Sequence, residues 1–237
     1  MDDKIIYLKD RKYICKNTIG IWFEKRDTVY DFIAGQYAEI TLLDKIYSDK
    51  DGDSRLFSIA SAPGKNELMF ATRAFDTAFN KNIMELPLGS RAKIGEPGGN
   101  TPLHTDTSKT AVFLIGGIGI TPVRSMFEYI TENKLPYKIY LFQSNPDKDS
   151  MAFFDEFMSW SERNENIKYI PTIDDINDST WKYEKGYLSE EMIKKYLTDF
   201  SDCIFYIVGP TVLVDKMEAV LKKNNVQQEN IKLERFG

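Results

Sequence analysis

Residues 111–236 alternate between apolar runs and amphipathic stretches, and this alternation constrains the fold more than any other feature of the chain. Continuous apolar runs of six or seven residues are typical of strands buried on both faces of a parallel sheet. The runs are AVFLIG (111–116), KIYLFQ (138–143), IKYIPT (167–172), CIFYIVG (203–209) and IKLERF (231–236). Because stretches with helical spacing separate them, we predict a doubly wound α/β domain with a parallel five-stranded sheet.

The first hundred residues have a different pattern, in which short runs of β-branched and aromatic residues lie between turn-forming segments. Such spacing predicts a small antiparallel barrel or sandwich. The runs are YICKNTIGIWFEK (13–25), QYAEITLL (36–43), RLFSIAS (55–61), ELMFATRA (67–74) and RAKIGE (91–96). We therefore predict a β domain at residues 1–103, a polar linker at 104–110 and an α/β domain at 111–237.

The charge balance and the apolar runs limit the classes of partner. A net charge of −5 without a basic cluster argues against nucleic-acid binding. No apolar run approaches the ~20 residues of a membrane span, and the charged start MDDKIIYLKD does not resemble a signal peptide. We expect a cytoplasmic protein, monomeric by default.

The few cysteines and the single histidine limit the chemistry. Cys15 and Cys203 are the only cysteines, too few for a disulfide framework, a zinc site or an iron–sulfur cluster. A Ser-His-Asp triad would need His104, which lies in the polar linker. We expect no metal site and no triad.

Two glycine-bearing turns are the strongest local signals. In LIGGIGITPVRSM (114–126) a buried strand runs into Gly116, Gly117 and Gly119, and Thr121 and Pro122 open a helix. Glycines let a backbone approach a ligand closely, and the free N–H groups of a helix start attract phosphate. Gly209 and Pro210 end a later strand in the same way, which favours a dinucleotide cleft at the carboxyl edge of the sheet. Ordinary strand-to-helix turns also use glycine, and the GxGxxG fingerprint is absent.

Several segments together resemble the ferredoxin–NADP reductase family, in that family's order and over nearly the whole chain. They are AGQY (34–37), RLFSIASAP (55–63), DTAFNKNIMELPLGS (76–90), GGIGITPVRSM (116–126), VGP (208–210) and ERFG (234–237). The resemblance implies a six-stranded antiparallel β-barrel that binds FAD, followed by a nicotinamide-binding α/β domain.

The resemblance also implies roles for individual residues. Arg55 would bind the flavin phosphate, Phe57 would pack on the flavin, and Ser58 would lie near flavin N5. Amides at the start of a short helix from Thr77 would receive the pyrophosphate, which favours FAD over FMN. Ser58 and Glu234 are the expected catalytic residues. The other expected cofactor-binding residues are Leu56, Thr72, Arg73, Ala78, Phe79, Gly116, Gly117, Gly119, Thr121, Pro122, Ser144, Asn145, Gly209, Pro210 and Phe236.

The chain departs from the family pattern at several positions. Phe57 replaces a tyrosine, Val208 replaces a cysteine, and EPGGN (96–100) replaces a Pro-aromatic-Gly turn. The sequence ends at Gly237, where some relatives continue into an aromatic tail, and we expect Phe236 to cover the flavin or the ring to be open to solvent.

The segment after the second α/β strand, FQSNPDKDS (142–150), bears on the choice of nicotinamide cofactor. Ser144 and Asn145 could contact the ribose, and Pro146 stands where NADP-specific relatives often carry arginine. Because a 2′-phosphate wants a cation there, the segment favours NADH over NADPH.

We thus predict a flavin-dependent NAD(P)H oxidoreductase that passes hydride from nicotinamide C4 to flavin N5. Single electrons would then go to a separate protein such as ferredoxin, rubredoxin or flavodoxin. The alternatives are a free flavin or ferric reductase and a non-catalytic flavin-binding regulatory module. Two acidic segments, DKDGDS (49–54) and DDIND (174–178), are interpreted as a solvated turn and a polar connection, because the first lacks the glycine and glutamate of a calcium loop.

Overall fold

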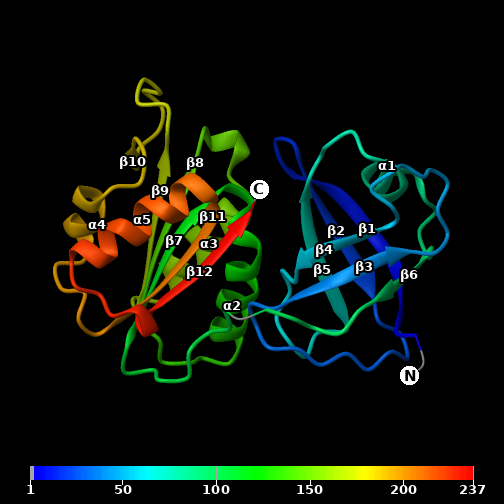
Figure 1. Cartoon of the computed structure of the whole chain (residues 1–237), viewed down its shortest axis with the longest axis horizontal. Helices are drawn as coiled ribbons and strands as arrows, with labels where there is room; N and C mark the ends of the chain where they lie inside the picture. The colour runs from blue at the N-terminus through cyan, green and yellow to red at the C-terminus, as the bar shows by residue number, and fades with distance from the viewer. Residues whose placement is uncertain (1–2, 100, 237) are drawn as a thin grey trace. The chain divides into compact units, whose positions relative to one another are not determined.

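The computed structural model describes residues 3–99 and 101–236, and their backbone forms two compact units. Residues up to 103, together with 121–129, form the first unit. Residues 104–120, together with those from 130 onward, form the second. Each unit is described below by itself (Figure 1).

The first unit contains a six-stranded antiparallel sheet, as the family resemblance implied. Its order is β4-β3-β6-β1-β2-β5. The two edge strands, β4 and β5, curl toward each other. A hydrogen bond joins them, in which the N–H of Ala60, just after β4, donates to the Met69 carbonyl in β5 at 2.7 Å. The strands are β1 (Ile5–Cys15), β2 (Thr18–Glu24), β3 (Tyr37–Leu42), β4 (Ser54–Ser58), β5 (Glu67–Arg73) and β6 (Arg91–Ile94).

A hairpin divides the run YICKNTIGIWFEK between β1 and β2. Cys15 pairs with Thr18, so the connection is a two-residue turn. Asn17 takes the left-handed conformation with φ 54°, which asparagine tolerates better than most residues. The run therefore supplies the end of one strand and the whole of the next.

Alternate residues of the strands fill the interior of the first unit. Ile19, Ile21 and Phe23 of β2 are 1% exposed. Helix α1 (Ala78–Glu85) adds Phe79 and Ile83 to this core. Its start is capped by Thr77, whose side-chain oxygen accepts from the Asn80 N–H at 3.2 Å. The core thus fixes both β4 and the start of α1.

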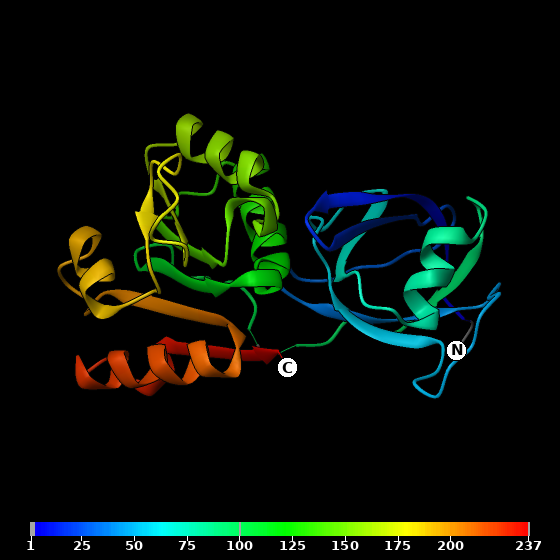
Figure 2. The ribbon, with the colours of Figure 1, turned by 90° about the horizontal axis from the view of Figure 1, so that it is seen from above.

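The second unit contains a parallel sheet in the order β10-β9-β8-β7-β11-β12. Helix α3 (Phe154–Arg163) covers one face, and α4 (Glu190–Tyr196) and α5 (Thr211–Lys223) cover the other (Figure 2). Three 3-10 turns, η1 (Gly117–Gly119), η2 (Lys148–Ser150) and η3 (Gln228–Asn230), lie in the connections. Helix α2 (Ile120–Glu132) follows η1 in the chain, and its residues 121–129 belong to the first unit. The strands are β7 (Thr110–Gly116), β8 (Ile139–Asn145), β9 (Ile167–Ile173), β10 (Glu184–Lys185), β11 (Cys203–Pro210) and β12 (Ile231–Phe236).

The doubly wound parallel sheet is confirmed, and it gains a sixth strand that the apolar runs did not indicate. This strand, β10, has two residues, which pair with Thr172 and Ile173 of β9. It is too short and too polar to form an apolar run. The other five strands match the predicted runs.

The strand order places a topological switch beside β7. The chain proceeds from β7 outward to β8 and β9, then returns to β11 on the other side of β7. In open α/β sheets, ligands bind outside the carboxyl ends of the strands at such a point. Within residues 3–99 and 101–236, no helix has both the length and the apolar composition that a membrane crossing requires.

Candidate functional site

The two glycine-bearing turns meet at the carboxyl ends of β7 and β11. Val208 pairs with Ile115, so Gly116 and Gly209 follow side by side. A Cβ on Gly116 would lie 2.9 Å from Cδ of Pro210. Gly209 has φ +154°, and a Cβ there would lie 3.0 Å from the Gly116 nitrogen. The backbones of the two turns therefore lie too close together for a side chain at Gly116 or at Gly209.

Gly119 makes a second close approach to the same strand end. A Cβ at this position would lie 2.7 Å from the Val208 carbonyl oxygen, which is a backbone atom that cannot rotate away. Helix α2 then begins at Ile120, so Thr121 and Pro122 are its second and third residues. Pro122 still lies in the first turn, where a missing N–H leaves no helical hydrogen bond unmade. Thr121 and Pro122 are both buried.

Ser144 and Asn145, the predicted ribose contacts, end β8 and are 8% and 2% exposed. The Asn145 side-chain amide donates to the Ser150 carbonyl at 2.9 Å. The Asp174 N–H donates to the Asn145 carbonyl at 3.0 Å, and the Asp174 carboxyl hydrogen bonds with the Ser144 side chain. Burial raises the pKa of Asp174.

Two oxygens beside this contact have no hydrogen-bond partner among the described residues. They are Oδ1 of Asn145 and Oδ1 of Asp174, and both are buried. Buried acceptors are nearly always paired in native proteins, so unpaired ones call for a donor. Sequence reasoning treated Asp174 as part of a polar connection; the contact with Ser144 makes it a member of the candidate site.

The end of β12 lies against the same strand end. Glu234 pairs with Val208 and Phe236 with Pro210. Glu234 and Phe236 are half-buried, whereas Val208 is 3% exposed. The register thus brings the predicted residues Gly116, Gly209 and Glu234 to one edge of the sheet.

In the first unit, β4 contains the Arg55-Leu56-Phe57-Ser58 motif from which flavin binding was predicted. Because side chains alternate between the two faces of a strand, Arg55 and Phe57 both point toward α1. The Phe57 ring centroid is 5.4 Å from that of Phe79 and 6.3 Å from that of Phe70. The Arg55 guanidinium carbon is 5.4 Å from the Phe79 ring centroid. Leu56 is 64% exposed.

Ser58, Thr72 and Arg73 complete the predicted flavin residues of the strands. Ser58 is half-buried and pairs with Tyr37. The Thr72 hydroxyl donates to the Arg73 carbonyl at 3.4 Å. Arg73 donates to the Thr18 hydroxyl at 2.9 Å. Arg73 is therefore engaged across the β2–β5 pair.

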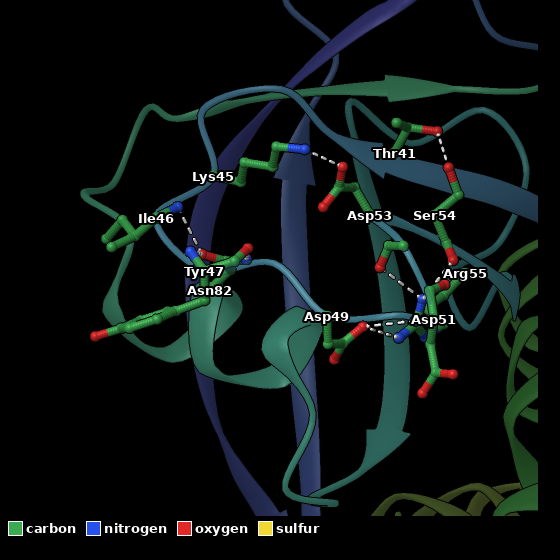
Figure 3. Close-up of polar contacts among 11 residues, drawn as sticks. Thr41, Lys45, Ile46, Tyr47, Asp49, Asp51, Asp53, Ser54, Arg55 and Asn82 are labelled. Atoms are coloured by element: carbon green, nitrogen blue, oxygen red, sulfur yellow. Dashed lines mark hydrogen bonds and ion pairs between the residues drawn. The ribbon is translucent and has the colours of Figure 1, made fainter.

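A carboxylate of the chain itself occupies the start of α1. The N–H of Ala78, next to the cap residue Thr77, donates to Asp49 Oδ2 at 2.7 Å. Asp49 Oδ1 lies 4.0 Å from Nη2 of Arg55. The hydrogen bond from Ala78 lowers the pKa of Asp49. Figure 3 shows Asp49 and Arg55 facing each other. The DKDGDS segment is an exposed turn, as interpreted, but Asp49 also accepts a hydrogen bond from the start of α1. Local spacing could not reveal a partner so distant in sequence.

His104 has a packing role in the second unit. Its N–H donates to the Tyr206 hydroxyl at 2.7 Å, and the Tyr137 hydroxyl donates to its carbonyl. The His104 ring stacks on the Tyr206 ring, with centroids 6.1 Å apart. Burial lowers the pKa of His104. The ring is thus held in a tyrosine cluster.

The two ends of predicted segments lie outside the described residues. These are Asn100 of EPGGN and Gly237 of ERFG. In residues 3–99 and 101–236 there is no group of three or more His, Cys, Asp or Glu side chains arranged to hold a metal.

A family profile described as "Oxidoreductase NAD-binding domain" matches residues 113–219. These residues include both glycine-bearing turns and the ends of β8 and β9. The match therefore covers the edge of the sheet described above.

Curated relatives extend the likeness to the first unit. A flavohemoprotein of Oceanobacillus iheyensis is 26% identical over 87% of this chain, which spans 52% of that protein. A probable flavin reductase of Aliivibrio fischeri is 24% identical over 94% of this chain and 93% of its own length. The chain thus spans about half the length of the flavohemoprotein.

Solved structures share the fold of the whole chain. The flavohem-like FAD/NAD-binding domain of a nitric oxide dioxygenase from Vibrio cholerae superposes with a TM-score of 0.83, 15% identity and full coverage of both chains. Ferredoxin–NADP+ reductase from Plasmodium falciparum, as an H286L variant, gives 0.79 and 17% identity, with 99% and 96% of the chains covered. The resemblance drawn from the sequence motifs is confirmed, while the roles of individual residues stay predictions.

Proposed function

We propose that the chain is an oxidoreductase of the ferredoxin–NADP reductase type, which oxidises NAD(P)H and passes the electrons through FAD to a separate acceptor. The NAD-binding profile, the shared fold and the likeness to a probable flavin reductase support this proposal. The observation that carries this proposal is the pair of glycine-bearing turns at Gly116 and Gly209. It lies at the topological switch of a domain that matches an NAD-binding profile. The relatives' names, a flavohemoprotein and a probable flavin reductase, support a flavin as the second cofactor.

The first unit offers the chemical groups that a phosphorylated flavin requires. A guanidinium fork (Arg55), an aromatic ring (Phe57) and the amides of the α1 start lie on connected elements. These groups match phosphate, a planar ring and pyrophosphate respectively. FAD, when bound, would accept two electrons as hydride and release them one at a time.

Within that arrangement we assign the chain a positioning role. Ser58, half-buried at the end of β4, would donate a hydrogen bond to the flavin near N5. Glu234, near the end of β12, would lie on the nicotinamide side, and Phe236, the last residue of that strand, would cover the flavin. Val208 stands where relatives carry a thiol, which is consistent with hydride transfer because no proton need pass there.

We propose further that NADH is the preferred donor. The unpaired oxygens of Asn145 and Asp174 can accept hydrogen bonds from ribose hydroxyls. A 2′-phosphate would bring its negative charge toward the Asp174 carboxylate, and like charges repel. We expect kcat/KM for NADH to exceed kcat/KM for NADPH at least tenfold. In Asp174→Asn, which removes the negative charge, this NADH-to-NADPH ratio should be smaller. A tenfold preference for NADPH would contradict this assignment.

The acceptor we propose is a small redox protein such as ferredoxin, rubredoxin or flavodoxin. A free flavin is the second candidate, favoured by the likeness over nearly full length to a probable flavin reductase. Reduction of cytochrome c with added ferredoxin, compared with added FMN, distinguishes the two.

The direct test is anaerobic stopped-flow mixing of the flavin-loaded protein with NADH and NADPH. We expect loss of the flavin absorption band with at least one of them. A protein that binds flavin and keeps its band with both nucleotides would instead be a non-catalytic binding module, and the proposed function would be wrong.

A further inference from the structure

The loop between β3 and β4 is fastened to helix α1 by a buried amide. Asn82 of α1 is 1% exposed. Its Oδ1 accepts from the N–H groups of Ile46 and Tyr47 at 2.8 and 2.9 Å, and its Nδ2 donates to the Tyr47 carbonyl at 2.8 Å. Figure 3 shows the loop held across the helix by these contacts. The path of the loop is therefore fixed two residues before Asp49.

The other end of the loop is fastened by Arg55. Nη1 of Arg55 donates to the carbonyls of Asp51, Gly52 and Ser54 at 2.9, 3.0 and 2.8 Å. Between the two anchors, Asp49 accepts from the N–H groups of Ala78 and Asp51 at 2.7 and 2.9 Å. Its side chain is 27% exposed. Contacts with Asn82 before it in the loop and with Arg55 after it thus hold the Asp49 carboxylate at the start of α1.

A carboxylate and a phosphate need the same donors. Both are anions that accept from first-turn N–H groups and from guanidinium forks. A flavin phosphate that reaches Ala78 must therefore displace Asp49, or bind beside it against like-charge repulsion. Riboflavin has no phosphate, so its binding does not require Asp49 to be displaced.

Building on the proposed flavin function, we infer that Asp49 is a specificity-determining residue. Its carboxylate competes with the flavin phosphate for the Ala78 N–H and Arg55. The phosphate group then adds little to affinity, and riboflavin, FMN and FAD bind with similar strength. Flavin would accordingly exchange with solution instead of being held as a tight prosthetic group.

The test is a fluorescence titration of flavin-free protein with riboflavin, FMN and FAD, for the wild type and Asp49→Asn. Asparagine keeps the size and one acceptor oxygen but removes the charge. We expect the Kd of FMN and FAD to fall about tenfold in the variant. The Kd of riboflavin should stay within about twofold.

Asp51→Asn is the matched control, because it removes the same charge from the same loop without touching the Ala78 N–H. It should leave all three Kd values near the wild type. Thermal unfolding verifies that each variant folds, and Asp49→Ser provides a second variant that withdraws the carboxylate.

Two results would overturn the inference alone: FMN and FAD binding that is unchanged or weaker in Asp49→Asn, or riboflavin binding that strengthens equally. If no flavin binds the wild type or either variant, the proposed flavin function falls together with the inference.

Discussion

We propose that phosphate-bearing cofactors bind at the start of α1 in the first unit and at the glycine-bearing turns of the second unit, and these two places are built differently. At α1 the geometry depends on side chains, since Asp49 and Arg55 set the charge around the Ala78 N–H. At the glycine-bearing turns it depends on the backbone, since Gly116, Gly119 and Gly209 leave no room for a Cβ. Specificity at the first site can therefore change by one substitution without a backbone shift, whereas a substitution at the second alters the fold itself.

The largest effect should come from Gly119→Ala. Its Cβ would meet the Val208 carbonyl oxygen at 2.7 Å, and overpacking against rigid backbone costs on the order of 3 kcal/mol. We expect the free energy of unfolding to fall by about that amount in denaturant titrations, with loss of NADH oxidation.

Gly95→Ala is the control for this variant, because its nearest neighbour would be the Glu39 Cβ at 3.4 Å, an ordinary contact. Equal stability of the two variants would contradict the view that the glycine-bearing turns require bare backbone.

Arg55→Gln, made in the Asp49→Asn background where no carboxylate competes for the phosphate donors, should have the next largest effect, on flavin binding. Loss of a charged hydrogen bond to phosphate costs about 2 kcal/mol, or roughly 30-fold in Kd. We expect weaker binding of FAD by fluorescence titration and little change for riboflavin. The control is Arg91→Gln, since Arg91 pairs with Asp44 on the surface. Equal weakening of riboflavin would mean that Arg55 serves the loop and not the phosphate.

The smallest effect concerns a charge cluster in the second unit, away from its turns. Glu190 accepts from Lys194 and Lys223 at 2.7 and 2.8 Å and from Asn224 at 3.0 Å. These hydrogen bonds, from Lys194 first, lower its pKa from 4.5 to about 2.

Because the folded-state pKa is depressed, the contribution of Glu190 to stability is complete above pH 4.5 and disappears as the pH falls toward 2. Glu190→Gln should therefore melt below the wild type at pH 7 and together with it near pH 2. A Glu229→Gln variant, at an exposed position, should match the wild type throughout. A melting difference for Glu190→Gln that is the same at both pH values would refute the electrostatic explanation.

Much of the fold and part of the site could be predicted from local patterns. The runs at 111–116 and 203–209 are long and apolar enough to be recognised as buried strands, and GGIGITP marks the turn after the first of them. The two-residue strand β10 has no such pattern. It forms because it pairs with β9, and its own composition does not indicate a strand. Asp174 was likewise hidden, since its contact with Ser144 exists only when β8 and β9 lie side by side.

The sequence by itself determined the two kinds of unit, the glycine-bearing turns and the resemblance to the family, because strand and turn preferences act over a few neighbouring residues. Only the tertiary structure decided what faces the start of α1. Asp49 and Ala78 are 29 positions apart, and their meeting depends on the buried Asn82 fastening the loop to the helix. Contacts of that range arise from the packing of whole elements, which no short segment of sequence encodes.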